Sequence, residues 1–134
     1  MRNRIVFIAV ALVLSSAEDA QACQCVVLSP KDALKRADAV FTGKVTKILE
    51  GRLVNEVTIE VTANWKGISK KEVIIYAHIQ RTACGYEFHA GENYLIYARR
   101  DSDMDVLTTD ACSTMRLAEA EADLKVLGKG ATIR

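Results

Sequence analysis

The chain has 134 residues, a length that allows one domain with a single hydrophobic core. Its 18 lysine and arginine residues are almost balanced by 17 aspartate and glutamate residues. This balance gives no electrostatic case for binding nucleic acid or an anionic membrane surface, so we expect neither as a partner.

The first 22 residues are typical of a secretory signal peptide. Two arginines form a basic start, a short apolar stretch follows, and Ala20 and Ala22 occupy the small-residue positions that precede a cleavage site. The apolar stretch is too short for a permanent membrane span. Cleavage after Ala22 makes Cys23 the first residue of the mature protein. We therefore expect residues 1–22 to be a signal peptide, residues 23–134 to form one domain, and the product to be secreted or periplasmic without membrane attachment.

A short helix and then a strand are predicted at the start of the mature chain. Ser29 can cap the helix, Pro30 suits its first turn, and the helix should end near Asp38. The β-rich stretch that follows, residues 40–49, contains Gly43, which predicts a bulge or bend.

The rest of the chain is predicted to be mostly strands with one final helix. Further strands are expected at residues 57–65, 72–77, 93–98 and 106–108. A last helix should start at Ser113 or Thr114, continue through Leu127 and stop at Gly128. These elements predict a mainly β fold, a five-stranded antiparallel barrel of the OB type with a short N-terminal helix and a C-terminal helix. A β-sandwich is the structural alternative.

All four cysteines follow the predicted cleavage site. An even number of cysteines in an exported chain predicts two disulfides. A bond between Cys23 and Cys25 would close a small strained ring. This leaves two pairings open: Cys23 with Cys84 and Cys25 with Cys112, or the crossed arrangement.

The sequence contains none of the motifs that mark common enzymes. It has no HExxH, no GxSxG and no phosphate-binding glycine loop, so we expect a protein that is not an enzyme and holds no cofactor of its own. Two minor alternatives use the cysteines: a zinc site built from Cys84, His89 and Cys112, and a thiol–disulfide exchange pair at Cys23 and Cys25.

Several short motifs follow one another along the predicted mature chain: Cys23-Gln24-Cys25, Ser29-Pro30, Ala33-Leu34, Ala37-Asp38-Ala39-Val40, Cys84-Gly85-Tyr86, Tyr94-Leu95-Ile96 and Cys112. In this order and spacing they resemble the tissue inhibitors of metalloproteinases, which belong to the netrin-like OB-fold superfamily. The resemblance covers essentially the whole mature chain.

This resemblance implies a disulfide framework and a mechanism. The disulfides would join Cys23 to Cys84 and Cys25 to Cys112. The free α-amine and the carbonyl oxygen of Cys23 would chelate the catalytic zinc of a target metalloproteinase in place of its bound water. The partner would be a zinc metalloproteinase, and the inhibitor would be a monomer.

The resemblance also implies which residues contact the protease. Gln24 would enter the pocket for the substrate side chain beyond the cut, and Cys25 and Val26 would lie along the active-site cleft. Thr82 and Ala83, next to the partner of Cys23, would complete this edge. The alternative function is a non-inhibitory extracytoplasmic netrin-like module that binds another protein.

Overall fold

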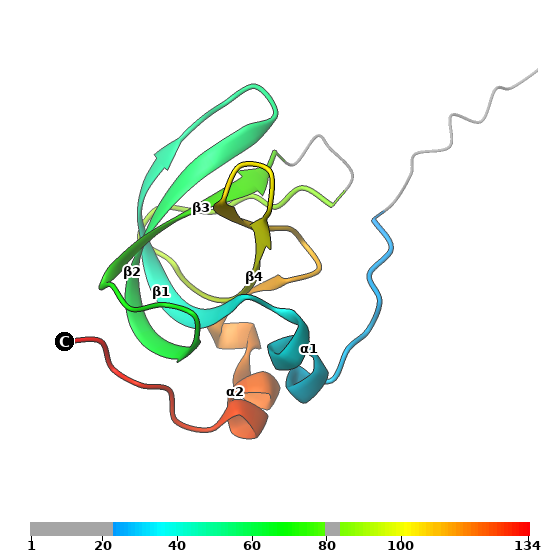
Figure 1. Ribbon diagram of the computed structural model, residues 1–134, viewed down its shortest axis with the longest axis vertical. Helices are drawn as coiled ribbons and strands as arrows, with labels where there is room; N and C mark the ends of the chain where they lie inside the picture. Colours follow the sequence, from blue (N-terminus) through cyan, green and yellow to red (C-terminus); the bar gives the residue numbers. More distant parts are fainter. Residues whose placement is uncertain (1–22, 80–83) are drawn as a thin grey trace, which may run out of the picture.

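Five strands close into a barrel in the computed structural model of the protein, which describes residues 23–79 and 84–134 (Figure 1). A short sixth strand pairs with one edge of β4 beside β5. Around the ring the strands are β1 (Ala39–Leu49), β2 (Val54–Lys66), β3 (Glu72–His78), β5 (Val106–Thr109) and β4 (Asn93–Asp101), which pairs again with β1; the sixth strand is β6 (Thr114–Arg116).

One pair in the ring, β3 and β5, runs parallel, with Ile75 opposite Leu107 and Ala77 opposite Thr109. The other strand pairs of the described sheet are antiparallel. The predicted antiparallel barrel is therefore wrong at this pair, and the barrel is mixed. The cause is geometric, because strand direction cannot alternate around a closed ring with an odd number of strands. The alternative prediction of a β-sandwich is also wrong, since the sheet closes on itself.

Strand β1 closes the barrel because it pairs along both of its edges. One edge pairs with β2, and the other pairs with β4 from Ala39 opposite Ala98 to Lys44 opposite Asn93. The register with β2 shifts between Thr42 and Gly43, which confirms the predicted irregularity at the glycine.

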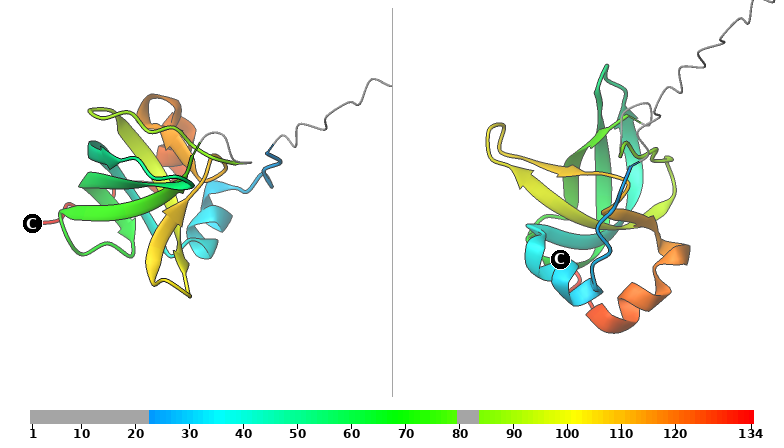
Figure 2. Two further views of the ribbon diagram at one scale, coloured as in Figure 1. Left: turned by 90° about the horizontal axis from the view of Figure 1, so that it is seen from above. Right: turned by 90° about the vertical axis from the view of Figure 1, so that its right-hand side faces the viewer.

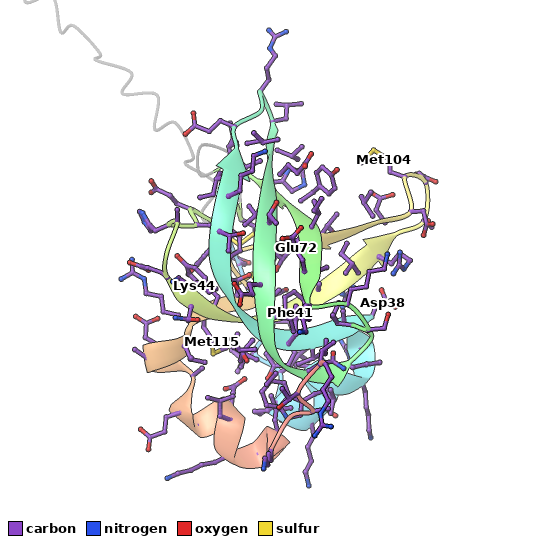
Figure 3. All side chains as sticks on the ribbon, turned by 90° about the vertical axis from the view of Figure 1, so that its left-hand side faces the viewer. Asp38, Phe41, Lys44, Glu72, Met104 and Met115 are labelled. Carbon is purple, nitrogen blue, oxygen red and sulfur yellow. A yellow bond between two sulfur atoms is a disulfide. The ribbon has the colours of Figure 1, made fainter. Side chains whose placement is uncertain are left out.

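The interior of the barrel is filled by apolar side chains from all five strands of the ring, together with Phe88 from the connection between β3 and β4. Most of these side chains are fully buried. The cluster comprises Ala39, Phe41, Val45, Val57, Ile59, Val61, Ile75, Ala77, Phe88, Tyr94, Ile96, Ala98 and Leu107. Figure 3 shows Phe41 within the barrel and Lys44, from the same strand, outside it.

A second, smaller core lies outside the barrel under the two helices. Helix α1 (Pro30–Arg36) and helix α2 (Glu121–Leu127) contact each other below the barrel (Figure 1). They cover the outward-facing side chains of β1 and β4, which are Val40, Leu95 and Tyr97. The helices therefore pack against β1 and β4, the two strands whose pairing closes the ring.

The N-terminal helix forms as predicted, and the C-terminal helix is shorter than predicted. Ser29 caps α1 by accepting a hydrogen bond from the backbone N–H of Asp32 at 3.2 Å. The predicted helix from Ser113 or Thr114 is wrong in its first part, because Thr114–Arg116 pairs with β4 as β6, and a 3₁₀ turn, Leu117–Glu119, precedes α2. No helix within the described residues is long and apolar enough to cross a membrane.

We predict that Gly43→Ala lowers the free energy of unfolding by about 1–3 kcal/mol. A Cβ at this position would lie 2.4 Å from Cγ2 of Ile59 and 2.6 Å from the carbonyl oxygen of Glu60, so a fully buried side chain and the β2 backbone would have to move. Urea unfolding measures the change. The matched control, Lys44→Ala, alters an exposed neighbour and should change stability by less than about 0.5 kcal/mol. Equal effects of the two substitutions would contradict the prediction.

Candidate functional site

The first residues of the described chain form an exposed edge beside the barrel. Residues 23–29 have no regular secondary structure and cross the outside of the barrel before entering α1 (Figure 2). Val26 and Val27 have relative exposures of 78% and 94%, which is unusual for two adjacent valines. Four of the residues predicted to form the site therefore lie together here: Cys23, Gln24, Cys25 and Val26.

Two disulfides fasten this edge to the barrel. Cys23 is bonded to Cys84 in the connection between β3 and β4, and Cys25 is bonded to Cys112 in the connection between β5 and β6. The Cα atoms of the two pairs are 4.8 and 5.3 Å apart. This pairing confirms the one implied by the resemblance. The terminal segment, residues 23–29, is thus held by two cysteines that are separated by a single residue.

One backbone hydrogen bond joins the two connections that carry Cys84 and Cys112, and a side-chain hydrogen bond fixes the second connection. The N–H of Ala111 donates to the carbonyl oxygen of Cys84 at 2.9 Å, and the N–H of Cys112 donates to Oδ1 of Asp110 at 2.9 Å. Cys84 has a φ of 63°, a conformation that costs a residue other than glycine of order 1–3 kcal/mol. Cys84 and Cys112, the two residues that anchor the terminal segment, are therefore held in place by contacts within the loops of the barrel.

The two disulfides touch each other. Sγ of Cys23 lies 3.4 Å from Sγ of Cys112, and the sulfur atoms of Cys23, Cys25 and Cys112 all lie within 4.8 Å of one another. All four cysteines are disulfide-bonded, so none offers a free thiolate. The alternative of a zinc site at Cys84, His89 and Cys112 is therefore wrong for the oxidised protein, because a thiolate is the form of cysteine that binds zinc.

A hollow lies beside the terminal segment on the outer face of the barrel. Its volume is about 380 Å³, and a smaller hollow of about 150 Å³ adjoins it and shares six lining residues. The charged groups around the larger hollow have both signs, so the hollow has no strong net charge. The shared residues are Val26, Leu28, Arg36, Arg99, Cys112 and Ser113.

The smaller hollow is lined by a buried tyrosine that links the barrel to α2. The hydroxyl of Tyr97 on β4 donates a hydrogen bond of 2.7 Å to Oδ2 of Asp123 on α2. Burial raises the pKa of the Tyr97 phenol above its ordinary value, and the hydrogen bond to the Asp123 carboxylate raises it further. A negative charge on this phenol is disfavoured by both effects, so Tyr97 acts as a neutral donor that positions the helix.

Other predicted site residues fall outside the described chain. Thr82 and Ala83 belong to the undescribed residues 80–83, and the predicted signal peptide belongs to the undescribed residues 1–22. The sequence analysis did not predict the exposure of Val27 or the hydrogen bond that Asp110 accepts beside Cys112. An exposed valine has no sequence signal of its own, whereas the aspartate two residues before Cys112 is typical of a side chain that accepts from a nearby backbone N–H.

Comparison with known proteins does not identify a family for this chain. No protein-family model matches the chain, and no curated protein matches it.

We predict that Tyr97→Phe flattens the loss of stability at alkaline pH. The raised pKa of Tyr97 means that, above about pH 10, the unfolded chain releases a phenolic proton that the folded protein retains. The free energy of unfolding should therefore fall with rising pH, by up to about 1.4 kcal/mol per pH unit for this group.

Urea unfolding between about pH 8 and pH 11 measures the slope. The variant should also lose about 1–3 kcal/mol at neutral pH, because Asp123 loses its donor. An unchanged alkaline slope in Tyr97→Phe would show that this phenol is not the group responsible.

Proposed function

We propose that this protein is an exported, monomeric inhibitor of zinc metalloproteinases, similar to the tissue inhibitors of metalloproteinases. The observation that carries the proposal is the exposed edge beginning at Cys23, which two adjacent disulfides hold against the barrel. The protein would act by stoichiometric occlusion of an active site rather than as an enzyme. Disulfide bonding of all four cysteines supports a secreted or periplasmic location.

The fold supports a netrin-like domain with an OB-type barrel spanning residues 23–134. The support comes from a closed ring of five strands, a short helix before β1 and a helix after the last strand. The fold alone does not define a function, because barrels of this type carry many kinds of binding site.

The proposed mechanism uses the backbone of Cys23 and not its sulfur. Cleavage after Ala22 would create a free α-amine beside the Cys23 carbonyl, and these two atoms can form a five-membered chelate ring with a metal. In a metalloproteinase they would take the open position on the catalytic zinc and displace its water. The sulfur of Cys23 is occupied by Cys84, which leaves the backbone as the ligand.

Rigidity of the edge supports tight binding. A segment that two disulfides already hold in place loses little conformational freedom when it enters an active site. Val26 and Val27 present apolar surface next to the terminus, and burying a valine side chain contributes roughly 1.5 kcal/mol or more. Thr82 and Ala83 would extend the contact on the side of Cys84.

Gln24 is the residue that would select among proteases. Its side chain is exposed and lies between the two tethered cysteines, where it would enter the pocket for the residue after the cut. The tissue inhibitors of metalloproteinases, which the sequence resembles, commonly carry a small hydroxyl residue there. Burying the longer amide without partners would cost about 1–3 kcal/mol, so we propose a target whose pocket offers polar groups.

We predict that one additional alanine before Cys23 reduces inhibition at least about 100-fold. The extension moves the free amine by about 3.8 Å along the chain and replaces it with an amide that cannot bind zinc. The measurement is titration of a panel of zinc metalloproteinases with the native and the extended proteins. Thermal unfolding and disulfide mapping should be the same for both.

The same titration distinguishes the alternative functions. Equal inhibition by both proteins would show binding without chelation and would overturn the mechanism. Inhibition by neither protein would favour a non-inhibitory binding module, for which the hollow of about 380 Å³ beside the terminus offers a surface.

We also predict that inhibition weakens at acid pH. An ordinary α-amine titrates near ~7.7–8.0 and binds zinc only when unprotonated, so the inhibition constant should rise about tenfold per pH unit below that range. Above that range it should be constant. Inhibition constants measured across pH test this, with a small chelating inhibitor of the same protease as the control for titration of the enzyme. Parallel pH profiles for the two inhibitors would contradict the role of the amine.

A further inference from the structure

The contact between the two disulfides has a chemical consequence that is independent of zinc. A separation of 3.4 Å between Sγ of Cys23 and Sγ of Cys112 is a van der Waals contact between sulfur atoms of different bonds. Disulfides rearrange when a thiolate attacks a sulfur atom of another disulfide. Cys112 is therefore already within attacking distance of Cys23 whenever its own bond is open.

The outer of the two bonds is the one that an external thiol can reach. Both cysteines of the Cys25–Cys112 bond are exposed, whereas Cys23 and Cys84 are half-buried. Cys25 lies on a segment without regular structure, and the sulfur of Cys112 has the sulfur of Cys23 against one side. An attacking thiol thus meets less obstruction at Cys25, and the group that leaves is then Cys112.

We propose that the two disulfides form one thiol-exchange site, at which a small thiol opens Cys25–Cys112 and the released Cys112 then takes Cys23 from Cys84. In the first step the external thiolate bonds to Sγ of Cys25, the Cys25–Cys112 bond breaks, and Cys112 leaves as a thiolate. In the second step that thiolate bonds to Sγ of Cys23, the Cys23–Cys84 bond breaks, and Cys84 leaves as a thiolate that takes a proton from solvent. Each step exchanges one disulfide for another, so no oxidant is consumed.

The two pairings of Cys23 compete within the folded barrel, because the sulfur of Cys23 is bonded to Cys84 and lies 3.4 Å from the sulfur of Cys112. The native bond spans 61 residues and the exchanged bond 89 residues. Hydrogen bonds hold Cys84 and Cys112 in neighbouring loops that the exchange need not disturb. The exchange therefore moves the terminus from one loop of the barrel to the other.

This exchange does not depend on the proposed inhibition of a protease, but its effect on inhibition does. If the amine of Cys23 binds zinc, moving Cys23 from Cys84 to Cys112 shifts the amine relative to the rest of the edge. Exposure to thiols would then switch the inhibitor off without unfolding the barrel.

The first test uses Cys25→Ser in the full chain, which leaves Cys112 unpaired without any added reductant. The free thiol is trapped with a maleimide, and the labelled and disulfide-linked peptides are identified by mass spectrometry. We expect label on both Cys84 and Cys112, because Sγ of Cys112 lies 3.4 Å from Sγ of Cys23 in the folded barrel. Label confined to Cys112 would overturn the proposal.

The matched control is Cys112→Ser, which leaves Cys25 unpaired on the same bond. It should put no label on Cys84, because release of Cys84 would require a bond between Cys25 and Cys23 in the strained Cys-x-Cys ring. Equal scrambling in both variants would also overturn the proposal, since it would show that the bonds rearrange without a specific relay through Cys112.

A second test uses the unaltered chain and so does not depend on the folding of a variant. The native protein is treated with reduced glutathione and trapped with the maleimide at short times. We expect glutathione on Cys25 together with maleimide on Cys84. Glutathione on Cys25 with maleimide only on Cys112 would overturn the relay. Because neither test includes a protease, a failure of the proposed inhibition would leave both results interpretable.

Discussion

Closure of the barrel through β1 is the constraint on which the rest of the structure depends. Strand β1 pairs with β2 on one edge and with β4 on the other, so its buried apolar side chains lie either inside the ring or under the helices. Gly43 allows β1 to approach β2 closely at the register shift. Without this closure, the loops that carry Cys84 and Cys112 would have no fixed positions, and the terminal segment would have nothing rigid to bond to.

The helices and the terminal segment both use the outer face that closure creates. Helix α1 continues directly from the tethered segment, and α2 is held to β4 by the hydrogen bond between Tyr97 and Asp123. The chemistry of the site therefore lies outside the barrel, while the barrel interior is occupied by apolar side chains. The outer face thus carries both the second core under the helices and the candidate site.

Local sequence signals predicted the elements that depend on local interactions. The cap at Ser29, the turn into α1, the strands near their observed positions and the irregularity at Gly43 all follow from residue types and short-range patterns. The missed features are non-local. Thr114 has the right side chain for a helix cap, but it is buried against Thr109 with their hydroxyls 2.7 Å apart, and pairing with β4 outweighs its local preference.

The parallel strand pair and the contact between the disulfides differ in how far the sequence could have predicted them. The presence of a parallel pair could have been deduced from five strands in a closed ring, because an odd ring cannot be wholly antiparallel, but not that the pair is β3 and β5. The 3.4 Å contact between Cys23 and Cys112 could not, since it depends on how two loops from distant parts of the chain approach each other. Exposure of Val27 depends in the same way on the path of the segment across the barrel.

The positions of the disulfides along the chain also order the events of biosynthesis. Cys23 is made 61 residues before Cys84, and Cys25 is made 87 residues before Cys112. The terminal segment is thus made before every strand of the barrel but can be fixed at both cysteines only after Cys112 has been made. Before β5 and the loop after it exist, the Cys23–Cys84 bond alone can hold the segment. A segment held at both points therefore requires all five strands of the ring, and a chain that ends before Cys112 cannot present one.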